Sequence, residues 1–125
     1  MRFLRLVLSI TIAGMFHIVS AQSITSASAD EIGRDWKRNA LGADLKYGKK
    51  TLNITGVVVT VDSIFDRYYV ALKAEGLFTG IRVYLDPSAP VEEIANLSAG
   101  QRVTMYCANI KDSLGLECYD GRLVK

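Results

Sequence analysis

The chain has 125 residues, of which 15 are Lys or Arg and 13 are Asp or Glu, so its formal net charge is only +2. A chain of this length has room for one domain with one modest hydrophobic core. The near-neutral charge does not favour a protein that holds nucleic acid mainly through its phosphates, because such proteins usually carry a clear basic surplus.

The first 21 residues have the pattern of an export signal. Arg2 and Arg5 make the start of the segment basic, and an apolar run extends from Leu6 to Val19. The run leads into small residues ending at Ala21, which is the kind of site that a signal peptidase cleaves. The run is shorter than the roughly 20 residues that span a bilayer, so we expect cleavage near Ala21 and no stable membrane anchor afterwards. The alternative is an anchor that stays attached. Cleavage would place the mature chain in the periplasm or outside the cell.

Loss of this signal would change the composition of the working protein. The only histidine, His17, lies in it, as do Arg2 and Arg5, which leaves 13 basic against 13 acidic residues. Without imidazole there is no Ser-His-Asp or Cys-His activation of a nucleophile and no histidine-based zinc site. We therefore expect no enzyme, no metal and no cofactor. A carboxylate pair such as Asp62 with Asp66 would need a convergence that spacing alone does not show.

Residues 22–27 are polar and Ser-rich and predict a flexible lead before a domain at 28–125. Ser28, with Glu31 three residues later, has the pattern of a helix-capping box. Apolar residues then recur at four-residue spacing and should share the helix face that packs on the domain: Ile32, Trp36 and Ala40.

Alternating apolar residues predict five strands, with a short helix between the third and the fourth. The first strand begins near Lys49, and its apolar parity changes at Gly56, as a β-bulge there would produce. The other strands and the short helix are expected, in chain order, around Tyr68–Leu72, Ile81–Leu85, Val91–Leu97 (the helix), Val103–Cys107 and Leu114–Cys118. This order is typical of the OB fold. The predicted fold is mainly β with helices: a five-stranded OB-fold barrel preceded by an N-terminal helix.

Two cysteines, Cys107 and Cys118, remain in the mature chain, and an exported chain meets an oxidising compartment in which paired cysteines are normally bridged. If the hairpin turn is centred between Asp112 and Ser113, the two cysteines lie directly opposite each other, at a separation that a disulfide accepts. Closing this loop should stabilise the fold by about 2–3 kcal/mol. A redox-active pair is the alternative, but the spacing is not Cys-x-x-Cys.

Three segments carry a resemblance to a known family. They are Ala43–Val58, with a tyrosine, glycine-lysine and a T-G-x-V strand, then Leu97–Thr104, with L-x-x-G-Q-x-V, and Leu114–Cys118, with the terminal cysteine. Over residues 28–120 the chain resembles the exported bacterial OB-fold group known as the tRNA_anti-like family. The resemblance implies the fold and the compartment. It implies no function, since the family name reflects similarity to nucleic-acid-binding OB domains and the family has no agreed catalytic or ligand residues.

OB folds bind ligands on the face of their second and third strands and in the flanking loops. Five aromatic and basic residues are expected there: Arg67, Tyr69, Lys73, Arg82 and Tyr84. Such side chains stack on bases or sugars and pair with anions, although they also serve as cross-strand pairs on a solvated face. We therefore predict an exported binding or protein-interaction module whose partner is an envelope protein or a small ligand. The alternative, a nucleic-acid or oligonucleotide-binding OB domain, is disfavoured by the neutral mature charge. The oligomeric state is not predicted.

Overall fold

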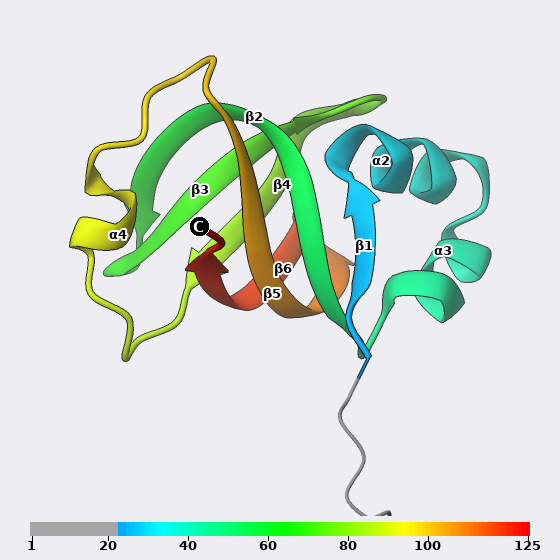
Figure 1. Cartoon of the computed structure of the whole chain (residues 1–125). Coiled ribbons are helices and arrows are strands. Elements are labelled where there is room, and N and C mark those ends of the chain that lie inside the picture. The colour runs from blue at the N-terminus through cyan, green and yellow to red at the C-terminus, as the bar shows by residue number, and fades with distance from the viewer. Residues whose placement is uncertain (1–22) are drawn as a thin grey trace, which may run out of the picture.

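Five strands close into a barrel in the computed structural model, which describes residues 23–125 (Figure 1). Their order is β2-β3-β4-β6-β5, and β5 pairs with β2 to close the barrel; all neighbours are antiparallel except β4 and β6. This is the predicted OB-fold barrel. The predicted signal at 1–21 lies outside the described residues. The strands are β2 Thr51–Ile64, β3 Arg67–Ala74, β4 Leu77–Leu85, β5 Arg102–Ser113 and β6 Gly115–Leu123.

The expected flexible lead is partly wrong. Strand β1, Thr25–Ser28, pairs in parallel with the start of β2, from Thr25 beside Leu52 to Ser28 beside Thr55. The backbone of this polar segment finds its hydrogen-bonding partners on the barrel, which the side chains alone did not indicate. Helix α2, Ala29–Arg38, follows at once.

The predicted helix cap is confirmed. The Ser28 hydroxyl accepts a hydrogen bond of 3.0 Å from the backbone N–H of Glu31, one of the groups that a helix leaves unpaired at its start. We expect Ser28→Ala to lower the free energy of unfolding by about 1 kcal/mol, measured by urea denaturation. Ser26→Ala, an exposed serine two residues earlier, is the control and should change it little. Equal losses in both variants would mean that the cap contributes nothing.

The helical prediction is wrong beyond Trp36, because the chain breaks at Asn39. Its backbone is extended, and its side chain accepts a hydrogen bond of 3.0 Å from the N–H of Gly42, so a second helix begins there. This helix, α3 (Ala40–Tyr47), leaves Ala40 exposed and buries Tyr47, whose ring stacks on Trp36 at a centroid distance of 6.4 Å. Asparagine favours such cap positions over helix interiors because its side chain bonds the local backbone.

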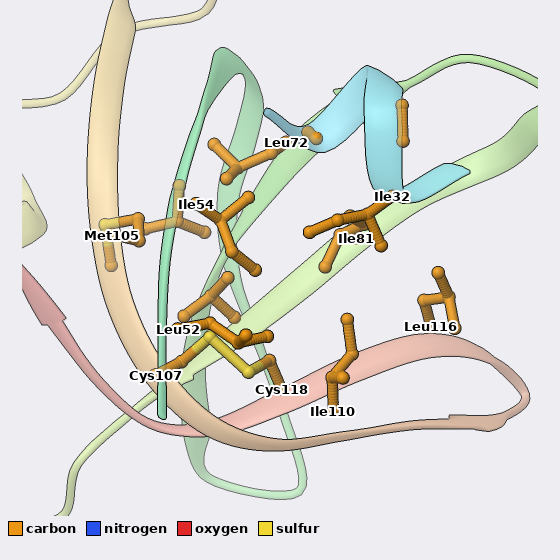
Figure 2. Close-up of a cluster of buried hydrophobic side chains, with 14 of the residues drawn as sticks. Ile32, Leu52, Ile54, Leu72, Ile81, Met105, Cys107, Ile110, Leu116 and Cys118 are labelled. Carbon is orange, nitrogen blue, oxygen red and sulfur yellow. A yellow bond between two sulfur atoms is a disulfide. The ribbon is translucent and has the colours of Figure 1, made fainter. Parts of the chain in front are cut away.

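The core fills the barrel and extends under α2 (Figure 2). Ile32 of α2 is fully buried, and Ile94 of the short helix α4, Glu92–Ala95, is 2 % exposed in the same core. Figure 1 shows α4 on the opposite side of the barrel from α2 and α3. The fully or almost fully buried strand residues include Leu52, Ile54, Val70, Leu72, Ile81, Met105, Ile110 and Leu116.

The bulge in the first barrel strand lies later than predicted. Burial keeps one parity from Leu52 through Gly56 to Val58, and the register shifts between Val58 and Thr60. Gly56 has a different role: a Cβ at this position would lie 3.0 Å from the Cβ of Ala29, so the glycine permits the close approach of α2 to the barrel.

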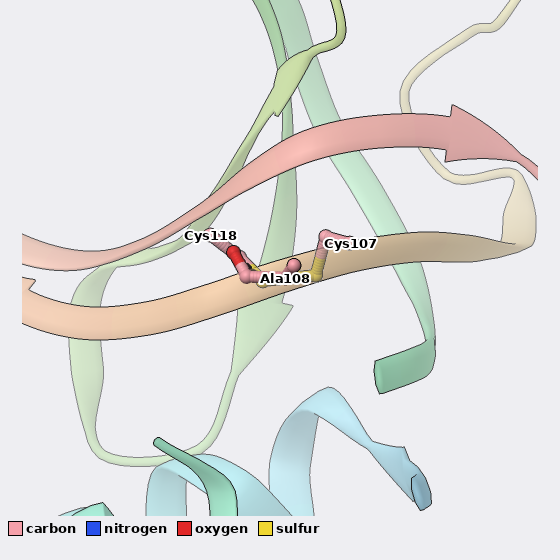
Figure 3. Close-up of a disulfide and its surroundings, with 3 residues drawn as sticks. All are labelled: Cys107, Ala108 and Cys118. Carbon is pink, nitrogen blue, oxygen red and sulfur yellow. Dashed lines mark hydrogen bonds between the residues drawn. A yellow bond between two sulfur atoms is a disulfide. The ribbon is translucent and has the colours of Figure 1, made fainter. Parts of the chain in front are cut away.

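A disulfide joins Cys107 to Cys118, with Cα atoms 5.8 Å apart and both side chains fully buried (Figure 3). The bridge is confirmed, but the predicted register is wrong. Ser113 pairs with Gly115, so the turn is centred on Leu114, and two shifts follow along the β5–β6 ladder. Leu114, expected in the last strand, is therefore exposed at the turn. Across the residues described, no helix has the length and apolar character needed to cross a membrane.

Candidate ligand-binding face

Four of the five predicted site residues come together on the outer surface of β3 and β4. Tyr69 lies opposite Tyr84, with ring centroids 5.6 Å apart. The guanidinium of Arg67 lies 4.8 Å from the Tyr84 ring centroid, and that of Arg82 lies 6.0 Å from the Tyr69 centroid, within the range of cation–π attraction. The fifth residue, Lys73, lies exposed where the β3–β4 register shifts, and the structure shows no contact of this kind for it.

Two residues of β6, which the strand pattern in the sequence did not indicate, complete the face. Tyr119 stacks on Tyr84, with the rings 9° from parallel and their centroids 5.6 Å apart, and the Arg67 guanidinium lies 5.4 Å from the Tyr119 centroid. Glu117 lies beside Arg82 in the parallel β4–β6 pairing. We define the aromatic–basic face as Arg67, Tyr69, Arg82, Tyr84, Glu117 and Tyr119.

Glu117 is the acceptor at the centre of this face. One carboxylate oxygen accepts from the Tyr119 hydroxyl at 2.7 Å, and the other accepts from the Tyr84 hydroxyl at 3.2 Å and lies 3.2 Å from Nη2 of Arg82. The same Nη2 donates to the carbonyl of Leu114 at 2.6 Å. The side chains of Arg82 and Glu117 are only 17 % and 13 % exposed, so water screens their charges little and the two charges largely neutralise each other. The hydrogen bonds to Glu117 hold the rings of Tyr84 and Tyr119 in place.

The environment of the face makes its tyrosines hard to ionise. Burial, and then the hydrogen bond to the Glu117 carboxylate, raise the pKa of Tyr119 to about 12. Burial, together with the nearby charge of Glu117, also raises the pKa of Tyr84. Burial and the hydrogen bond to Asp35 raise the pKa of Tyr47, outside the face, to about 12.

Stability should therefore fall as pH rises through the range from about 10 to about 12. An unfolded tyrosine releases its proton near pH 10, whereas Tyr47 and Tyr119 keep theirs until about 12, so the native state binds more protons in this window. Below pH 10 both states are protonated and this contribution is fully present. Urea denaturation at several pH values should show the fall, and Tyr119→Phe should make it shallower. A slope in Tyr119→Phe equal to that of the wild type would contradict this assignment.

A cavity of about 400 Å³ lies over the aromatic–basic face. Its floor is formed by Arg67, Arg82, Tyr84, Glu117 and Tyr119. Its rim comes from two turns, β2–β3 and β5–β6, whose large apolar side chains face solvent: Ile64, Phe65 and Leu114, with Phe65 90 % and Leu114 84 % exposed. In OB folds the corresponding loops flank the ligand face.

The turn that carries Phe65 has a strained backbone. Phe65 and Asp66 have φ values of 51° and 61°, the left-handed region that a phenylalanine rarely adopts. For Phe65 this conformation costs about 1–2 kcal/mol, whereas aspartate tolerates it more readily, and such costs are concentrated at functional sites. The turn thus holds an apolar ring in water at a position where a glycine or an asparagine would fit with less strain.

The face also carries positive charge that no carboxylate neutralises. Arg67 contacts the rings of Tyr84 and Tyr119, and Lys111 lies 5.2 Å from the Tyr119 centroid, but within residues 23–125 neither cation forms an ion pair. An aromatic floor, an apolar rim and free cations can accept a ligand that presents both an apolar group and an anionic group.

Comparisons with known proteins agree with this architecture. The family model described as tRNA_anti-like matches residues 15–112. A solved structure from Klebsiella pneumoniae, a lipoprotein to which nucleic acid binding has been ascribed, superposes with a TM-score of 0.60 at 21 % identity, covering 82 % of this chain and 92 % of that one. At this identity the likeness shows the fold. No curated protein matches the chain.

Proposed function

The chain belongs to the tRNA_anti-like family, and on that premise we propose that it is an exported OB-fold protein-interaction module that binds its partner through the aromatic–basic face. The observation that carries the proposal is the cavity of about 400 Å³ whose floor is aromatic and basic and whose rim is apolar and exposed. Tyrosine and arginine side chains that line a pocket are among the residues that contribute most of the binding free energy of protein interfaces. Support for export comes from the basic and apolar pattern of residues 1–21 and from the lipoprotein to which this fold is similar.

The exposed aliphatic side chains favour a protein partner. Ile64 and Leu114 stand beside Phe65 on the rim, and aliphatic groups gain energy by burial against an apolar surface rather than by stacking on bases. Tyr84, in contrast, is only 5 % exposed, and it serves as the floor that keeps Arg67 in position.

Binding of single-stranded nucleic acid is the second candidate. The stacked pair of Tyr84 and Tyr119 under Arg67 favours it, since aromatic rings and arginines also hold bases and phosphates, and so does the role ascribed to the Klebsiella protein. Such binding would weaken steeply as the salt concentration rises, because phosphate contacts release counterions. The equal numbers of basic and acidic residues after residue 21 argue against it.

The test is capture of partners from envelope extract with the oxidised mature chain as bait. Phe65→Ser removes an exposed ring from the rim, and Phe78→Ser, which removes a fully exposed ring that does not line this cavity, is the matched control. We expect a partner to be retained by the wild type and by Phe78→Ser and lost with Phe65→Ser. Retention by both variants would place the interaction elsewhere. Substitutions of Arg82 or Tyr84 are less suitable because both side chains hold the face together.

A further inference from the structure

The cavity over the aromatic–basic face continues toward α4. A second cavity, of about 250 Å³, adjoins it at Arg67, which lines both. A third, of about 390 Å³, adjoins the second at Tyr68 and Val91, which line both of those. Because neighbouring cavities share lining residues, the three form a series across the start of β3, from the β5–β6 turn to α4, which we call the groove. A single small molecule would occupy one of these cavities, whereas the whole groove fits an extended chain.

The two ends of the groove differ in charge. In the cavity near the β5–β6 turn, Arg67 is the lining cation without an ion pair among the described residues, and it lies where this cavity meets the second one, while Glu117 is neutralised by Arg82. Lys111 stands beside this cavity, 5.2 Å from the Tyr119 centroid. The second and third cavities are lined by three carboxylates, Asp66 and Asp86 in the second and Asp62 in the third, beside α4, and none of them forms an ion pair within the described part of the chain. Hydrogen bonds from Ser88 lower the pKa of Asp86, so it stays ionised at neutral pH.

Apolar side chains are exposed along the whole groove. Phe65 stands at the basic end, and Tyr68 and Val91, 49 % and 42 % exposed, stand at the acidic end with the pocket wall of Val61 and Ile94 beneath them. An occupant therefore meets an apolar surface throughout and charges of opposite sign at its two ends.

We infer that the groove binds an extended peptide segment of mixed charge, with acidic residues over Arg67 and Lys111, apolar residues between, and basic residues beside Asp62 and Asp66. This inference rests on the proposed function and names the kind of partner. Charge complementarity selects a peptide over nucleic acid, because a polyanion lying along the groove would bring phosphates against the carboxylates, and like charges repel each other across an interface.

The experiment selects binders from a random peptide display library with the mature, oxidised chain as the target. We expect enriched peptides to carry acidic residues at one end, apolar residues in the middle and basic residues at the other end. The affinity of one synthetic enriched peptide is then measured by fluorescence anisotropy. Asp62→Asn/Asp66→Asn should weaken it at least about tenfold, and Arg67→Glu should weaken it more. The charge-matched control, Glu92→Gln/Asp120→Asn, removes two exposed carboxylates that line none of the three cavities and should leave the affinity unchanged.

The outcomes separate this inference from the proposed function. Binding that is lost with Arg67→Glu but unaffected by Asp62→Asn/Asp66→Asn would overturn the inference and leave the proposed face intact. Binding insensitive to both variants would overturn the two together. Failure of the library to yield binders, with salt-sensitive binding of single-stranded oligothymidylate instead, would also overturn the inference and would favour the nucleic-acid candidate.

Discussion

Replacing both cysteines, Cys107→Ala with Cys118→Ala, should lower the free energy of unfolding by about 3 kcal/mol. The bridge spans a sequence separation of 11, which limits the freedom of the unfolded chain by about 2–3 kcal/mol, and both side chains are fully buried, so the smaller alanines also leave space in the core. Small domains are stable by only about 5–15 kcal/mol, so this loss is large. Urea denaturation of both proteins measures it.

Reductant provides the control for the disulfide. Adding it during denaturation should destabilise the wild type by a similar amount and leave the double variant unchanged. Reduction of the folded wild type should be slow, because neither cysteine side chain is exposed. Rapid reduction of the native protein with no loss of stability would show that the bridge has a role in redox chemistry rather than in the fold.

Glu117→Ala should lower the free energy of unfolding by about 3 kcal/mol, although Glu117 lies on an outer face. The substitution leaves the largely buried guanidinium of Arg82 without its carboxylate partner. It also removes the hydrogen-bond acceptor to which the hydroxyls of Tyr84 and Tyr119 donate. Removing one partner of a buried ion pair typically costs more than the pair contributes, because the remaining charge stays desolvated. Thermal or urea denaturation measures the loss.

Two further variants make the Glu117 prediction specific. Glu117→Gln keeps an acceptor oxygen, so it should lose less stability, and it should lower the pKa of Tyr119, because the nearby negative charge is gone. Titration by phenolate absorbance detects this shift. Glu92→Ala, an exposed carboxylate on α4, is the surface control and should be neutral within about 0.5 kcal/mol. Equal effects of Glu117→Ala and Glu92→Ala would mean that the hydrogen-bonded cluster does not stabilise the face.

Much of the barrel could be predicted because β2, β5 and β6 alternate between buried and more exposed residues over most of their length. In the β5–β6 hairpin the errors arose where left-handed residues other than glycine change the register. Asn109 and Asp120 have φ values of 58° and 56°, close to the shifts in the β5–β6 ladder, and no local pattern announced them. The predicted bulge was assigned to Gly56 because a glycine interrupted the pattern, whereas the shift follows Val58. The bridge survived the wrong register because a disulfide tolerates a range of Cα separations.

The part of the candidate site on β3 and β4 could be predicted from the sequence, whereas the part on β6 could not, because of the order of the strands in the barrel. Tyr69, Arg82 and Tyr84 lie on strands adjacent in sequence, so strand parity alone was enough to place them together. Glu117 and Tyr119 reach the face only because the last strand pairs in parallel with β4, a long-range contact. Their alternation with Leu116 and Cys118, combined with the strand order of an OB fold, would have been the signal that identified them.

Site-specific photocrosslinking in intact cells tests directly whether the aromatic–basic face binds a protein partner. A photoreactive amino acid replaces Phe65 in one strain and Phe78 in another, since both rings are exposed but only Phe65 lines the cavity over the aromatic–basic face. We predict a discrete crosslinked adduct with a protein partner at position 65 and none at position 78. An adduct at position 78 with none at 65, or an adduct at 65 that contains nucleic acid instead of protein, would contradict the assignment of this face as a protein-binding surface.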